Sequence, residues 1–89
     1  MDLIEKIKKE LPQKIYCVYN GYRKYYPLFQ GAFSSKKEAF QYCKNELKRS
    51  VYQVRKEGER TYFDFGQGLE WYLCIKETRK KDLKIKFDF

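Results

Sequence analysis

The sequence feature that most constrains the fold is a capped amphipathic helix near the middle of the chain. Residues 35–38, Ser-Lys-Lys-Glu, have the S-x-x-E form of a capping box, in which the serine hydroxyl accepts a first-turn amide and the glutamate reaches back to the cap. We predict a helix from about Lys36 to about Lys48. One arc of this helix is apolar and would dock on a sheet; it contains Ala39, Phe40, Cys43 and Leu47.

A basic stripe lies directly beside this apolar arc. It contains Lys37, Gln41, Lys44 and Lys48. Two interpretations stay open. The stripe can be a solvated helix edge whose lysine stems cover apolar neighbours, or it can be one wall of an anion-binding surface.

The remaining pattern predicts strands. Residues 14–19, KIYCVY, are apolar on both faces, which is typical of a strand in the middle of a sheet. Residues 51–56, 61–65, 69–76 and 83–89 predict four further strands, and the alternation is clearest in 69–76, where Leu69, Trp71, Leu73 and Ile75 share one face. A short helix starting at Asp2 and ending before Pro12 would precede them.

These elements predict one α+β domain over residues 1–89. We expect an antiparallel sheet of about five to six strands with two helices packed on one face, in the order α-β-β-α-β-β-β-β.

The second strand has two possible registers. Asn20-Gly21 is the strongest short hairpin signal in the chain and favours a tight turn. The alternative is a wider loop over residues 22–26, with the strand at 28–33 after Pro27, and this register leads more directly into the helix cap. We prefer the second.

The loop in that register, YRKYYP, interleaves basic and aromatic residues with no acid nearby. Phosphates are bound by Arg and Lys, and unstacked bases by flat aromatic rings. The same composition suits a protein-binding hot spot, in which Tyr and Arg are enriched. A third possibility is that these tyrosines pack on the sheet.

The charge is strongly basic and unevenly distributed. Twenty Lys and Arg oppose twelve Asp and Glu, which gives a formal charge of +8. Between Lys14 and Arg49, eight basic residues face only Glu38 and Glu46. This asymmetry favours a polyanionic partner, either nucleic acid or an acidic protein surface.

Several classes of function find no support in the residue types. The chain has no His, so ordinary acid–base chemistry at neutral pH lacks its usual group. The three cysteines are widely spaced, which argues against a zinc site and favours small core side chains in a reducing compartment. We expect no enzyme activity, metal, cofactor or membrane association, and a soluble cytoplasmic protein.

The leading hypothesis is a small non-enzymatic binding module that engages nucleic acid. The candidate residues are Arg23, Lys24, Tyr25 and Tyr26 in the loop, and Lys37, Lys44 and Lys48 on the helix. The alternative is a small regulatory or inhibitory protein of phage or mobile-element type, which binds a protein partner such as a host nucleic-acid enzyme.

Overall fold

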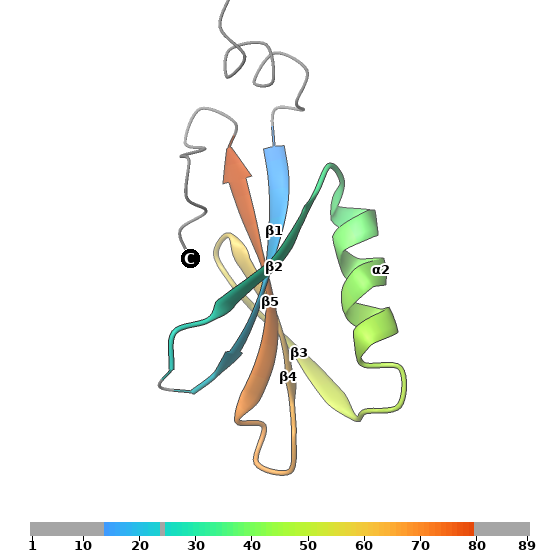
Figure 1. Ribbon diagram of the computed structural model, residues 1–89, viewed down its shortest axis with the longest axis vertical. Coiled ribbons are helices and arrows are strands. Elements are labelled where there is room, and N and C mark those ends of the chain that lie inside the picture. Colours follow the sequence, from blue (N-terminus) through green and yellow to red (C-terminus); the bar gives the residue numbers. More distant parts are fainter. Residues whose placement is uncertain (1–13, 24, 80–89) are drawn as a thin grey trace, which may run out of the picture.

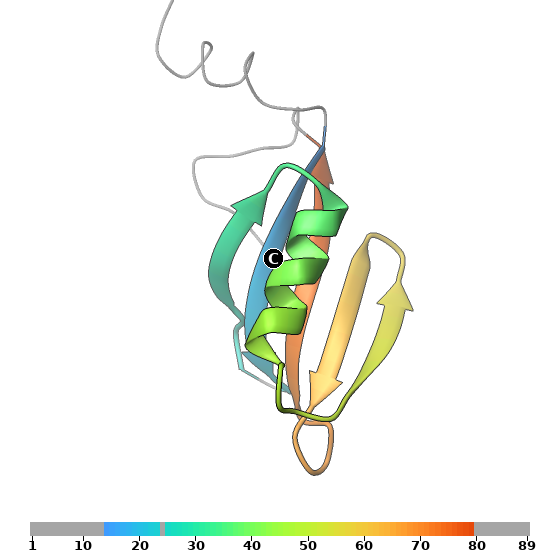
Figure 2. The same ribbon diagram turned by 90° about the vertical axis from the view of Figure 1, so that its right-hand side faces the viewer.

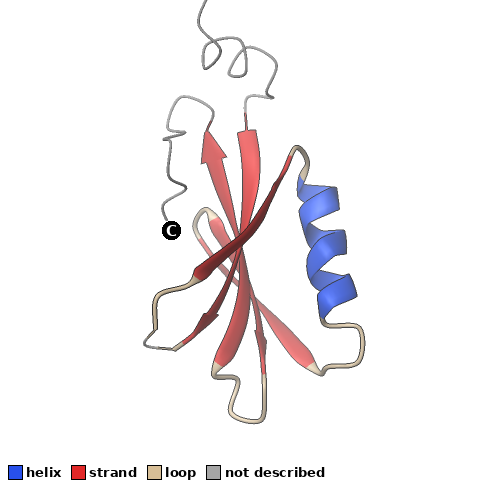
Figure 3. Ribbon diagram, in the orientation of Figure 1, coloured by secondary structure: helices blue, strands red, loops and turns tan. Residues whose placement is uncertain are grey.

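The fold is a five-stranded antiparallel sheet with one helix on one face, seen in a computed structural model that describes residues 14–23 and 25–79 (Figure 1). The strands are β1 (Lys14–Tyr22), β2 (Leu28–Phe33), β3 (Tyr52–Glu57), β4 (Arg60–Phe65) and β5 (Trp71–Arg79). The helix is α2 (Lys36–Glu46). Figure 3, coloured by secondary structure, shows the single described helix on one side of the strands. The predicted α+β class is confirmed.

The sheet order is β2-β1-β5-β4-β3, so β1 and β5 are the central pair. Strands β3, β4 and β5 form a meander and correspond to three of the four strands predicted after the helix, and β1 lies inside the sheet as its two-sided apolar pattern predicts. The predicted helix at 2–11 and the predicted strand at 83–89 lie outside the described residues.

The helix begins where the sequence predicts. The hydroxyl of Ser35 accepts a hydrogen bond from the amide of Glu38 at 3.2 Å, which satisfies a first-turn donor. The Glu38 carboxylate instead accepts from the hydroxyl of Ser34, at 3.3 Å. The helix ends at Glu46 with Leu47 as its C-cap, so the predicted end at Lys48 was too late and Lys48 lies in the following turn.

The helix packs across β1, β2 and β5, as seen from its own side in Figure 2. Ala39, Cys43 and Leu47 are buried, and Phe40 packs edge-on against Phe63. This confirms the predicted apolar arc. The sheet side of this core is formed by Val18, Phe63, Leu73 and Ile75.

A second group of buried side chains alternates with the first and lies on the opposite face of the sheet. It contains Ile15, Cys17, Tyr19, Tyr62 and Cys74, with Tyr72 packed against it. The central strands therefore bury both faces, which explains why the 14–19 pattern does not alternate between apolar and polar.

The wider register of β2 is the correct one. Strand β1 runs through Asn20-Gly21 to Tyr22, and β2 starts at Leu28, directly after Pro27. Proline at the entrance of an edge strand removes no ladder hydrogen bond that the sheet needs. The strand predicted at 69–76 begins later than expected, at Trp71, because Leu69 adopts a left-handed backbone with φ of 54° in the preceding turn.

Candidate functional site

An aromatic pocket lies where β1 and β5 meet the β1–β2 loop. The register places Tyr22 directly opposite Trp71, and their ring centroids are 4.8 Å apart. Tyr25 in the loop extends this contact, because its ring centroid lies 5.7 Å from that of Tyr22. Two residues of the sheet and one of the loop thus form a continuous aromatic group.

Hydrogen bonds hold the loop in this place. The amide of Tyr25 donates to the carbonyl of Tyr22 at 2.8 Å, which closes a turn. The amide of Arg23 donates to the carbonyl of Glu70 at 3.0 Å, and its guanidinium donates to the carbonyl of Gly68 at 3.4 Å. Arg23 therefore ties the β1–β2 loop to the β4–β5 loop.

The pocket has a volume of about 380 Å³ and a mostly apolar lining. Its lining residues carry no formal charge; they are Asn20, Gly21, Tyr22, Tyr25, Tyr26, Leu28 and Trp71. Several of them are unusually open to solvent for large apolar side chains: Tyr25 is 71% exposed, Tyr26 is 96% and Leu28 is 70%. Exposed apolar groups that gather around a hollow are typical of an interaction site.

One polar atom at the pocket lacks a partner. The side-chain oxygen of Asn20 is buried and accepts no hydrogen bond from the described residues. Leaving a buried acceptor unsatisfied costs about 1–3 kcal/mol. A rotation of the side-chain amide would let this oxygen accept a hydrogen bond from a donor in the pocket.

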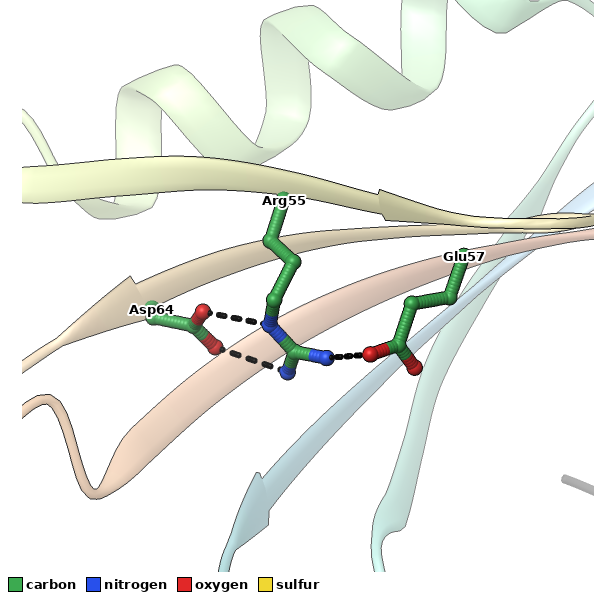
Figure 4. Close-up of polar contacts among 3 residues, drawn as sticks. All are labelled: Arg55, Glu57 and Asp64. Carbon is green, nitrogen blue, oxygen red and sulfur yellow. Dashed lines mark hydrogen bonds and ion pairs between the residues drawn. The ribbon is translucent and has the colours of Figure 1, made fainter.

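A second hollow, of about 400 Å³, contains a network of opposite charges. Its centre is Arg55, which donates two hydrogen bonds to Asp64, at 2.9 and 3.3 Å, and a further one to Glu57 (Figure 4). The guanidinium also lies 4.1 Å from the ring centroid of Tyr62, a cation–π contact, and burial raises the pKa of Tyr62 to about 12. Arg23 also lines this hollow, but Asp64 and Glu57 already engage Arg55 and Glu70 adds a further carboxylate, so the lining has no net positive charge to offer an anion.

The structure brings part of the predicted site together. Arg23, Tyr25 and Tyr26 share the β1–β2 loop, and all three are exposed. Their exposure rules out the possibility that Tyr25 and Tyr26 are covered by the sheet. Lys24 lies outside the described residues.

The predicted helix residues belong to a different element. Lys37 and Lys44 are exposed on α2, and Lys48 is exposed in the turn after it. In Figure 1 the helix lies to the right of the sheet, and the β1–β2 loop lies at the lower left of the sheet. The loop residues and the helix lysines therefore come from different elements, and each group needs its own test.

Sequence reasoning missed Asn20, Leu28 and Trp71 as site residues. In the sequence, Asn20 belongs to a turn signal and Trp71 is one apolar position of an alternating strand. Their meeting depends on two pairings: β1 with β2 places Leu28 opposite Asn20, and β1 with β5 joins residues about fifty positions apart, such as Tyr22 and Trp71. The available signal was the position of Trp71 and Tyr22 at strand ends, where aromatic side chains are less covered.

Comparisons of the chain with protein-family models, with curated proteins and with solved structures find no match. Among residues 14–23 and 25–79, no group of three or more Cys, Asp and Glu side chains is placed to hold a metal ion. The described part of the chain also contains no helix long and apolar enough to cross a membrane.

Proposed function

We propose that the protein is a non-enzymatic module that binds single-stranded nucleic acid at the aromatic pocket. The observation that carries this proposal is the exposure of Tyr25 and Tyr26 beside a pocket without carboxylates, in a chain of formal charge +8. Exposed aromatic rings stack on bases, and basic side chains neutralise phosphates.

Arg23 directly follows Tyr22 in the chain; its side chain lines the second hollow, and one of its five N–H donors contacts Gly68. It can therefore contact a phosphate without leaving its loop. Lys37, Lys44 and Lys48 would add phosphate contacts if the strand continues from the pocket to the helix.

The test is fluorescence anisotropy with labelled single- and double-stranded oligonucleotides at two salt concentrations. We expect tighter binding of single strands, and a log–log salt slope of about −0.7 for each phosphate neutralised. Absence of binding to either form at low salt would refute the proposal.

Two variants separate the aromatic from the basic contribution. Replacing both Tyr25 and Tyr26 by alanine should weaken binding roughly 5- to 150-fold for each stacked base lost. Val51→Ala is the matched control, because Val51 is 89% exposed and lies outside the pocket. Lys44→Glu should reduce the salt slope. Its control is Lys56→Glu, which makes the same charge change on the exposed edge strand β3.

A protein partner is the second candidate. It is favoured by Leu28, an aliphatic side chain that is 70% exposed and would not stack on a base. An interface centred on Tyr, Trp and Leu would respond weakly to salt, whereas phosphate binding responds steeply. Such a partner would be an acidic protein surface, as the charge of the chain suggests.

A further inference from the structure

We propose that the aromatic pocket receives one unstacked base of the bound strand, whose edge donates a hydrogen bond to Asn20. This inference rests on the proposed function and makes it more specific. It distinguishes a strand that lies over the surface from one that inserts a base into it.

The first argument is the shape of the pocket. A volume of about 380 Å³ is at the lower end of the range of small-ligand sites, about 300–1,000 Å³, so it suits a single ring system better than a folded segment. Rings reach the pocket from two segments, Tyr22 and Trp71 from the sheet and Tyr25 and Tyr26 from the loop. A flat heteroaromatic ring can contact both sets through its faces.

The second argument is the unpartnered acceptor. Asn20 lines the pocket, and its side-chain oxygen has no donor among the described residues. The terminal torsion of asparagine is broad, so the amide can turn toward a ring that enters. Every natural base carries at least one N–H on its pairing edge, so this contact favours a base over an apolar side chain without selecting one base.

The third argument is the charge around the opening. The lining is neutral, whereas the guanidinium of Arg23, which contacts Gly68, lines the second hollow. A nucleotide combines a flat neutral ring with a charged phosphate, so the ring matches the neutral pocket and the phosphate stays outside it, where the β1–β2 loop carries Arg23. An acidic or apolar peptide would match one of these features but not both.

The experiment uses Trp71, which is the single tryptophan of the sequence and lines the pocket. The intrinsic fluorescence of the full chain is titrated with a thymidine oligonucleotide, and with a strand of equal length in which every base is replaced by an abasic site. We expect quenching by the first strand only, and anisotropy should show the base-containing strand bound roughly 5-fold or more tightly at equal phosphate number.

Two variants localise the effect. Tyr26→Ala, at a position that is 96% exposed and so tolerant of change, should reduce the advantage of the base-containing strand. Asn20→Ala should reduce it further, with little effect on the abasic strand. Asn45→Ala is the control, because Asn45 is an exposed amide on α2 whose described partner is Gln41.

The outcomes are distinct. Equal affinity for both strands with unchanged Trp71 emission would overturn base insertion and leave nucleic-acid binding in place. No binding of either strand would overturn both proposals. Quenching by an acidic peptide, with no binding of either strand, would likewise overturn both proposals and would favour the protein partner.

Discussion

At the scale of single residues, Gly21 shows how a strong local signal can have a different physical origin. Asn20-Gly21 is typical of a tight hairpin turn, yet both residues lie inside β1. A Cβ on Gly21 would lie 2.8 Å from Cε1 of Tyr72 and closer still to the end of its ring. Glycine is needed here because the ring of Tyr72, paired opposite Gly21 in β5, covers the backbone.

We therefore predict that Gly21→Ala destabilises the fold by about 1–3 kcal/mol, the usual range for overpacking. The ring cannot move freely because it also packs edge-on against Tyr62 at 5.4 Å. Urea denaturation would measure the change. Gly31→Ala is the control, since a Cβ there meets Phe33 at an ordinary 3.6 Å.

The control outcome decides the interpretation. If Gly21→Ala and Gly31→Ala cost the same, the ring of Tyr72 is not the cause of the loss. If Tyr72→Ala removes most of the cost of Gly21→Ala, the two residues are coupled as the structure implies.

At the scale of elements, the start of α2 depends on one side chain. The hydroxyl of Ser35 is the acceptor for the amide of Glu38, so Ser35→Ala should cost about 1 kcal/mol of unfolding free energy. Ser35→Asp keeps an acceptor at the cap and should retain most of the stability. Both are measured by chemical denaturation.

Ser34→Ala is the matched control for the cap. Its hydroxyl donates to the Glu38 carboxylate at the exposed surface, so its removal should matter less. A larger loss from Ser34→Ala than from Ser35→Ala would contradict this assignment.

The central pair of strands is joined by an ion pair that predicts a pH dependence. Lys14 on β1 lies 3.1 Å from the carboxylate of Glu77 on β5 and, with a hydrogen bond from Tyr16, lowers its pKa from the usual 4.5. Because its pKa is lower in the folded than in the unfolded state, the ionised carboxylate stabilises the fold above the unfolded-state pKa. This stabilisation is lost as the pH falls through the folded-state pKa. Glu77→Gln should therefore destabilise the fold at pH 7, by up to about 1 kcal/mol for a partly exposed pair.

The difference between Glu77→Gln and the parent protein should shrink as the pH falls below 4.5 and vanish below the lowered folded-state pKa, as followed by thermal unfolding across pH. Glu59→Gln is the control, because no ion pair is described for its carboxylate. A difference that persists unchanged in acid would show that Glu77 acts through packing instead of charge.

The sequence predicts elements better than their pairing, for a physical reason. The cap at Ser35, the apolar arc of α2 and the meander from β3 to β5 depend on local chemistry and periodicity. The pocket depends on the register that sets Tyr22 opposite Trp71. Nothing local to Trp71 specifies that partner, so the pocket could not be predicted. The loop tyrosines were candidate residues, but their exposure stayed open until the structure showed it.

At the scale of the whole molecule, the three cysteines report whether both faces of the sheet unfold together. Cys43 is a residue of α2 and lies in the core between the helix and the sheet, whereas Cys17 and Cys74 lie in the group on the opposite face. All three side chains are fully buried, and burial raises the pKa of Cys17 and raises those of Cys43 and Cys74 to about 12. Each thiol is thus shielded from reagents and held in its unreactive protonated form.

We predict that a thiol-specific reagent at pH 8 labels none of the three in the native state, and labels all three over one denaturant range. Single-cysteine variants, with the other two replaced by alanine or serine, would assign each rate. If both faces belong to one cooperative core, the labelling of Cys43 and of Cys74 should follow the same unfolding free energy in parallel variants of equal stability. Labelling of Cys74 at lower denaturant than Cys43 would show that the face opposite the helix opens on its own, and the described sheet would then contain two units of different stability.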